Sequence, residues 1–187
     1  MLDSLKNTLP AYAKDLKLNL SSLLRDETLE PVRRYGVALA AAYASKSEAL
    51  IKACTIEAAQ YLEPDDIENV KAANAMMGMT NIYYRFLHMA KDAEYQRMAA
   101  GLRMQIIGKP PADKVNFELY SLVVSAVNGC EFCVAAHDAE LKKASLTREE
   151  IQASIKIAAT LHAIAGVLSV EAVEQISAEG HKNIQAA

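Results

Sequence analysis

Apolar residues recur at intervals of three and four along most of the 187-residue chain, and prolines at positions 10, 31, 64, 110 and 111 interrupt the pattern. This spacing is typical of amphipathic helices. Because proline is favoured in the first turn of a helix, Pro31 predicts a helix that reaches about Tyr43. Pro64 opens a longer helix that carries the sequence VKAANAMMGMTNIYYRF. The stretch GKPPADK at 108–114 is the strongest internal boundary.

The last long apolar stretch, IQASIKIAATLHAIAGVL, follows a capping box made by Thr147 and Glu150, so we expect a central helix there. The composition agrees with helices. Hydrophobic residues make up 52% of the chain, and glycine and proline occur only seven and five times. Ala, Leu, Glu and Lys, which favour helices, are plentiful. The sequence therefore predicts a compact all-α fold made of many helices.

Two motifs occur twice along the chain. LEPDDI at 62–67 and LTREEI at 146–151 share a leucine, two consecutive acidic residues and an isoleucine, each at the start of a predicted helix. YGVALAAAYASKSEALIKA likewise aligns with YSLVVSAVNGCEFCVAAHD. We therefore predict one domain over residues 1–187, built from two related helical halves at approximately 1–108 and 109–187.

Charge and hydropathy indicate which partners and which cellular compartment to expect. The net charge of −3 offers no basic excess to neutralise phosphates, which argues against a nucleic-acid partner. The first residues mix charges and do not resemble a secretory signal. The nearly uncharged segment at 157–170 is too short to span a bilayer, so we expect a cytoplasmic protein that does not bind membranes. Three cysteines in a reducing compartment argue against a structural disulfide framework.

The candidate chemistry is concentrated in NGCEFCVAAH at 128–137. Asn-Gly ends the preceding helix, which predicts Cys130 in the first turn of the next one, where unpaired N–H groups and the helix dipole favour a thiolate. On a helix, Cys130, Cys133 and His137 share one face. The aligned positions of the first half carry no thiol, since they are Ser45, Glu48 and Lys52.

Three interpretations of the two cysteines are open. Helical residues three apart have Cβ atoms about 5–6 Å apart, whereas a relaxed disulfide needs about 3.5–4.5 Å. A bond between them would distort the turn and be easily reduced, as in a redox centre. A zinc site would instead combine Cys130, Cys133 and His137 with Glu118. Two thiols can also pack as small hydrophobic side chains.

Glu118 and His137 are the candidate proton carriers. His137 lies one turn beyond Cys133 and could take its proton. Glu118 belongs to the apolar segment KVNFELYSLVVSAV, which could return it to the thiols as a general base. The alternatives are a half-buried helix histidine and a solvated surface glutamate. The methionines at 76, 77 and 79 are interpreted as core filler rather than as metal ligands.

Taken together, these residues resemble the alkyl hydroperoxidase D (AhpD) proteins of the carboxymuconolactone decarboxylase-like superfamily. The resemblance is carried by LPAYAKDLKLNLSSLL at 9–24, MMGMTNIYYR at 76–85, GLRMQII at 101–107 and above all NFELYSLVVSAVNGCEFCVAAH at 116–137. It implies an all-helical protomer, assembled as a homotrimer, that reduces organic hydroperoxides and peroxynitrite. It also implies that no cofactor or metal is bound.

The resemblance assigns a role to each candidate residue. Cys133 would be oxidised by peroxide to a sulfenic acid, and Cys130 would resolve it and contact a partner peroxiredoxin of the AhpC type. Glu118 and His137 would relay protons. The external reductant would be dihydrolipoamide, carried on a lipoyl-bearing acyltransferase and regenerated by dihydrolipoamide dehydrogenase.

Phe132 departs from the family pattern, which has a histidine between the cysteines next to Cys133. We expect the peroxidase step to depend more heavily on His137 and Glu118, and Phe132 to offer an apolar wall to a lipoyl arm. The alternative function is a disulfide carrier or adaptor that moves electrons between a lipoyl domain and a peroxiredoxin and reacts little with peroxide.

Overall fold

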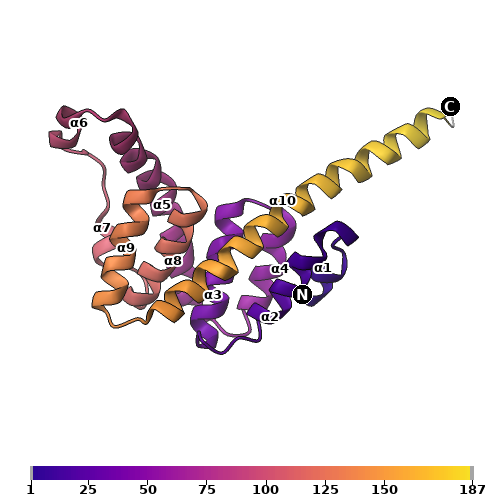
Figure 1. Cartoon of the computed structure of the whole chain (residues 1–187), viewed down its shortest axis with the longest axis horizontal. Coiled ribbons are helices and arrows are strands. Elements are labelled where there is room, and N and C mark those ends of the chain that lie inside the picture. The colour runs from indigo at the N-terminus through magenta and orange to yellow at the C-terminus, as the bar shows by residue number, and fades with distance from the viewer. Residues whose placement is uncertain (1, 186–187) are drawn as a thin grey trace.

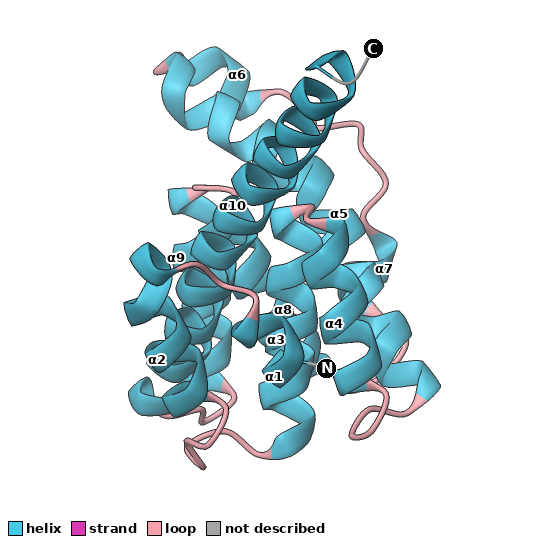
Figure 2. Cartoon of the chain, turned by 90° about the vertical axis from the view of Figure 1, so that its right-hand side faces the viewer, coloured by secondary structure: helices cyan, strands magenta, loops and turns pink. Residues whose placement is uncertain are grey.

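The chain folds into a bundle of α-helices, as the sequence predicts. A computed structural model describes the backbone of residues 2–185 and the side chains of residues 2–174, and within this part there is no β-strand. Figure 2 shows helices joined by loops and turns. The elements are α1 (Leu2–Asn7), η1 (Ala11–Ala13), α2 (Lys14–Leu23), α3 (Pro31–Ser45), α4 (Glu48–Ala58), α5 (Pro64–Ala90), α6 (Ala93–Arg97), α7 (Gln105–Gly108), α8 (Lys114–Val127), α9 (Glu131–Lys143) and α10 (Arg148–Gln185).

Helices α3 and α8 form the centre of the bundle. They pack on each other, α10 lies along α3 and α8, and α5 contacts both of them from another side. Helix α9 packs on α8 and α5 (Figure 1). All ten residues from 116 to 125 in α8 are buried, which is the environment of a helix surrounded by other helices. The fold therefore encloses the segment that carries Glu118.

The predicted helix starts agree with the structure. Pro31 and Pro64 each occupy the first turn of a helix. The Thr147 amide donates to Glu150 at 2.8 Å and the Glu150 amide donates to Thr147 at 3.1 Å, which completes the capping box of α10. The first turn of α5 carries a capping box at the matching motif. Both copies of the repeated motif thus cap the start of a helix. The division of the chain into two related halves stays a prediction.

Helix α10 is central over its first half only. Among its side chains that the structure describes, at 148–174, the last buried one is Ala165, and the helix then projects away from the bundle (Figure 1). By length and composition alone, Arg148–Glu174 is also apolar enough to cross a membrane, although 44% of its most apolar window is buried inside the protein. Packing against α2, α3 and α8 buries most of the apolar residues up to Ala165, whereas Val170 and Val173 are 52% and 63% exposed.

Gly36 on α3 lies directly against Tyr120 on α8. A Cβ atom added there would overlap the ring of Tyr120, which is fully buried and whose hydroxyl donates to the Val32 carbonyl at 3.4 Å. We expect Gly36→Ala to lower the free energy of unfolding by about 1–3 kcal/mol. This loss comes in spite of the roughly 0.5–1 kcal/mol that alanine gains over glycine inside a helix. Urea denaturation measures the difference.

Gly166→Ala is the matched control for this prediction. Gly166 lies in α10, and a Cβ built there would meet nothing within 4 Å apart from its chain neighbours and the nearby backbone of its own helix. The same substitution should therefore raise the stability by about 0.5–1 kcal/mol. Equal shifts in the two variants would show that contact with Tyr120 does not limit the residue at position 36.

Candidate redox site

The reversal between α8 and α9 places the two cysteines. Gly129 has φ +68°, in the left-handed region that ends helices. The Gly129 amide donates to the Ala126 carbonyl at 3.1 Å and the Cys130 amide to the Ser125 carbonyl at 3.0 Å, the two bonds of a Schellman motif. Cys130 is therefore the N-cap of α9. The prediction that Cys130 lies in the first turn was wrong by one residue, because the Cys130 amide still takes part in the Schellman motif that ends α8.

A disulfide bond joins Cys130 to Cys133, with a Cα–Cα distance of 5.3 Å. This separation is within the usual range for disulfides. The Cys133 amide donates to the Cys130 sulfur at 3.4 Å, as a capping side chain usually accepts from the third helical residue. The bond therefore joins the N-cap of α9 to the third residue of the helix.

Glu118 and His137 form a buried pair beside the disulfide. Glu118 comes from α8 and His137 from α9, and their side chains meet with 2.6 Å between Oε2 and Nδ1. Glu118 is 8% exposed and His137 is 9% exposed, so Glu118 is not a solvated surface residue. A contact this short and this enclosed is a charge-assisted or shared-proton hydrogen bond. The structure thus brings the four candidate residues of the sequence into one region.

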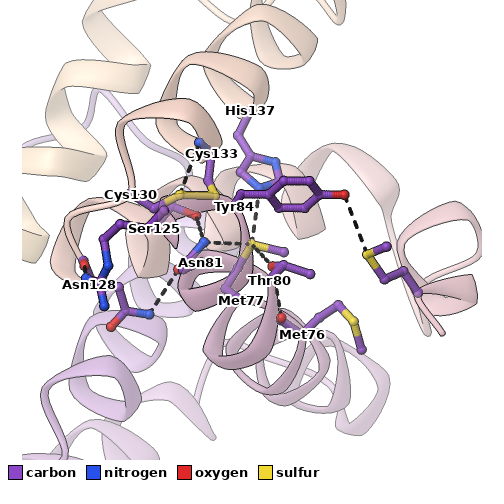
Figure 3. The surroundings of a disulfide bond; sticks show 12 residues. Met76, Met77, Thr80, Asn81, Tyr84, Ser125, Asn128, Cys130, Cys133 and His137 are labelled. Atoms are coloured by element: carbon purple, nitrogen blue, oxygen red, sulfur yellow. Dashed lines mark hydrogen bonds between the residues drawn. A yellow bond between two sulfur atoms is a disulfide. The ribbon is translucent and has the colours of Figure 1, made fainter. Parts of the chain in front are cut away.

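Met77 on α5 contacts the second ring nitrogen of His137, and sequence analysis did not anticipate this. Its sulfur lies 3.2 Å from Nε2 of His137 (Figure 3). The hydroxyl of Thr80 and the amide of Asn81 donate to the same sulfur at 3.5 Å and 3.6 Å. Met77 is 2% exposed. It is core filler by burial, but its thioether is also a polar partner of the site.

A polar network ties α5 to the reversal that carries Cys130. The Asn81 amide donates to Ser125 at 2.9 Å, and the Asn128 amide donates to Asn81 at 3.0 Å. Arg85 donates to the Asn128 carbonyl at 2.5 Å. The signal for this network was present in the sequence, because Met77, Asn81 and Arg85 follow one another at four-residue intervals on one face of α5.

A cavity of about 200 Å³ opens next to Cys133 and His137. Cys133 is 4% exposed, whereas Cys130 is fully enclosed. The remaining walls come from α5, α7 with the residue that precedes it, and α9, and they are mostly apolar: Met77, Thr80, Tyr84, Met104, Ile107, Phe132 and Ala136. A small apolar molecule in this cavity would therefore meet the sulfur of Cys133 before that of Cys130.

Phe132 stands at the edge of this cavity with its ring partly in solvent. It is 46% exposed. Its ring stacks on Tyr84 with 5.3 Å between centroids and is nearly perpendicular to the ring of His88, with 5.7 Å between those centroids. Phe132, Tyr84 and His88 also line a second cavity of about 250 Å³ on the outer side. The position that carries histidine in the family pattern therefore forms an aromatic wall here.

The disulfide favours redox chemistry over metal binding. Sulfurs that are bonded to each other are not the thiolates that zinc requires. Among the residues that the structure describes, no group of three or more histidine, cysteine or acidic side chains is arranged to hold a metal ion.

Cys54, the third cysteine, lies apart from this site and is 1% exposed. Burial raises the pKa of its thiol to about 12. We expect the oxidised native protein to resist iodoacetamide at pH 8, because alkylation requires a thiolate that is accessible to the reagent. Unfolding without a reductant should release one reactive thiol per chain, which mass spectrometry counts. Rapid labelling of Cys54 in the native protein would contradict its enclosure.

The fold and site define a class: an all-helical protein with a disulfide of the CxxC type beside a buried carboxylate–imidazole pair. Residues 93–174 match the carboxymuconolactone decarboxylase family. The chain is 49% identical over 170 residues to alkyl hydroperoxide reductase AhpD of Maricaulis maris, covering 91% of this chain and 98% of the relative. It is 46% identical over 171 residues to AhpD of Rhodospirillum centenum, covering 91% and 92%. It is 44% identical over 173 residues to AhpD of Brucella anthropi, covering 92% and 98%.

The chain therefore belongs to the AhpD family. This confirms the resemblance found in the sequence.

Proposed function

We propose that this protein is an alkyl hydroperoxide reductase that uses Cys133 as its peroxide-reactive thiol. The names of its relatives support the activity. The observation that carries the residue assignment is the cavity of about 200 Å³, which reaches Cys133 and His137 but not the enclosed sulfur of Cys130. An organic hydroperoxide in this cavity would meet the nucleophile, Cys133, and a proton carrier, His137, on the same wall.

The proposed cycle has three balanced steps. The Cys133 thiolate attacks the peroxide ROOH and, with one proton from the Glu118–His137 pair, yields the sulfenic acid and the alcohol ROH. The Cys130 thiol then displaces water from the sulfenic acid and forms the disulfide. Two thiols of dihydrolipoamide finally reduce the disulfide and leave as lipoamide. The sum converts ROOH and dihydrolipoamide into ROH, water and lipoamide.

The positions of the two sulfurs support a direction for the reductive step. A lipoyl thiol entering the cavity reaches Cys133, so the mixed disulfide forms there and Cys130 leaves as a thiolate. The Cys133 amide already points at the Cys130 sulfur at 3.4 Å and would stabilise that charge. Contact between Cys130 and a peroxiredoxin requires this sulfur to become exposed first.

The partners follow the family pattern. We place the protein in the cytoplasm, where a lipoyl-bearing acyltransferase and dihydrolipoamide dehydrogenase would supply electrons and an AhpC-type peroxiredoxin would receive some of them. The aromatic wall formed by Phe132 and Tyr84 suits the hydrocarbon part of a lipoyl arm. Peroxynitrite is a second oxidant of the same thiol in this proposal.

Exposed apolar side chains support a homotrimer. The C-terminal end of α5 and the segment around α6 extend from the bundle (Figure 1). They carry large apolar side chains that are 42–73% exposed: Ile82, Phe86, Met89, Tyr95 and Met98. A surface of this kind is typically covered by another protein surface, here by further copies of the chain.

The deciding experiment is a peroxidase assay with reduced lipoamide and cumene hydroperoxide. We expect the protein to consume both in equal amounts. Stopped-flow mixing of the reduced protein with peroxide then measures the oxidative step alone. Slow oxidation together with fast formation of mixed disulfides would favour the disulfide carrier and overturn the proposed activity.

A further inference from the structure

Both ring nitrogens of His137 face groups that accept hydrogen bonds. Nδ1 lies 2.6 Å from the Glu118 carboxyl group, and Nε2 lies 3.2 Å from the Met77 sulfur. A thioether sulfur has no proton to donate. A favourable contact at Nε2 therefore requires a proton on that nitrogen, and a bare Nε2 would place two lone pairs against each other.

We propose that Met77 is a positioning residue that keeps a proton on Nε2 of His137 while the disulfide is closed. With Nε2 protonated, the 2.6 Å contact on the other side of the ring still needs a proton between Nδ1 and the Glu118 oxygen. The Glu118–His137 pair consequently holds two protons in the oxidised protein. The proton on Nε2 faces the Met77 sulfur, and Met77 and Cys133 line the same cavity.

The sulfur of Met77 is held in place for this contact. Thr80 and Asn81 donate to it at 3.5 Å and 3.6 Å, and Asn81 also donates to Ser125 at 2.9 Å (Figure 3). Met77 is 2% exposed and Asn81 is 1% exposed. The flexible thioether is thus fixed from three directions by groups on α5 and α9.

A thioether suits this position because it is a weak acceptor. This step depends on the proposed function. When the second lipoyl thiol breaks the mixed disulfide, the sulfur of Cys133 leaves as a thiolate, which attracts a proton far more strongly than the neutral Met77 sulfur does. The Nε2 proton can then leave Met77 for the sulfur of Cys133. A carbonyl or carboxylate in place of Met77 would retain the proton more firmly.

Nitrogen-15 NMR of the oxidised protein tests the tautomer directly. His137 is assigned by the resonance that disappears in His137→Asn. We expect Nε2 of the unmodified protein to resonate where protonated ring nitrogens do. In Met77→Leu, which conserves volume but removes the acceptor, the resonance should move to the range of unprotonated nitrogens, because Nδ1–H then serves Glu118 alone. Met77→Gln supplies an amide oxygen and should restore the protonated position.

Met76→Leu is the matched control. It is the same chemical change on the neighbouring residue, whose sulfur makes no hydrogen bond among the residues that the structure describes. The His137 resonances should stay unchanged in this variant. An unprotonated Nε2 in the unmodified protein, or unchanged resonances in Met77→Leu, would overturn the proposal.

The reductive half-reaction tests the consequence of this tautomer. Reduction of the disulfide by dihydrolipoamide should slow by roughly tenfold in Met77→Leu and not in Met76→Leu. A shifted tautomer with an unchanged rate would show that Met77 orients the ring without serving the reaction. The NMR readout needs neither peroxide nor reductant. A failed peroxidase assay therefore leaves the test of the tautomer intact, and the two proposals can fail separately.

Discussion

Replacing Cys133 by serine should abolish peroxide consumption, with a loss of at least about a thousandfold in the lipoamide-dependent rate. A serine hydroxyl is not ionised at neutral pH and does not form the disulfide. Cys133 also lines the cavity next to His137, so no other thiol of the chain is placed to replace it within the described structure. The coupled assay with cumene hydroperoxide measures the loss.

Cys130→Ser separates the roles of the two sulfurs. Cys133 should still react with peroxide in this variant, but only once, because no thiol remains to resolve the sulfenic acid. Trapping with dimedone followed by mass spectrometry should find the adduct on Cys133 in Cys130→Ser and on neither sulfur in Cys133→Ser. Full turnover by Cys133→Ser would refute the proposed mechanism.

Glu118→Gln should have the second largest effect, a loss of about a hundredfold in the oxidative step. Glutamine has the same shape and can still accept a hydrogen bond from His137, but it neither takes nor gives a proton at neutral pH. The buried imidazole then has no partner with which to exchange its proton. The variant keeps the pair satisfied, whereas His137→Ala would leave a buried carboxylate without a partner and cost about 3–5 kcal/mol of stability.

Glu140→Gln provides the control for this substitution. Glu140 is on the same helix as His137, but it is exposed and pairs with Lys143 at 3.7 Å on the surface. Its replacement removes the same charge without touching the buried pair. Stopped-flow oxidation should be unchanged in Glu140→Gln, and an equal loss in both variants would indicate a general effect of charge.

Local chemistry explains which parts of the fold could be predicted. Pro31, Pro64 and the capping pair Thr147 and Glu150 act within one helical turn, so their helices began where the sequence indicated. The projection of α10 beyond the bundle had no such marker. The reversal after α8 also gave a local signal, Asn-Gly, but the number of residues that it consumes depends on backbone dihedrals, and Cys130 was misplaced by one position.

The candidate site was predictable to the extent that it lies on one helix. Cys133 and His137 share a face of α9 by helical periodicity alone. The contact between Glu118 and His137 requires α8 and α9 to lie side by side. The short reversal between the two helices indicated this arrangement. The Met77 contact joins residues from α5 and α9 that are sixty positions apart. No local rule places these two helices side by side, so this thioether looked like one more apolar side chain.

The enclosure of Cys130 bears on which reductants can restore the protein. Glutathione is a bulky, charged tripeptide, whereas a lipoyl group is a slender chain that ends in two sulfurs. The cavity of about 200 Å³ is mostly apolar, and it reaches Cys133 but not the enclosed sulfur of Cys130. We therefore expect it to admit a lipoyl group far more readily than glutathione. In the proposed cycle we therefore expect the oxidised protein to react slowly with glutathione and to depend on its lipoyl donor for reduction.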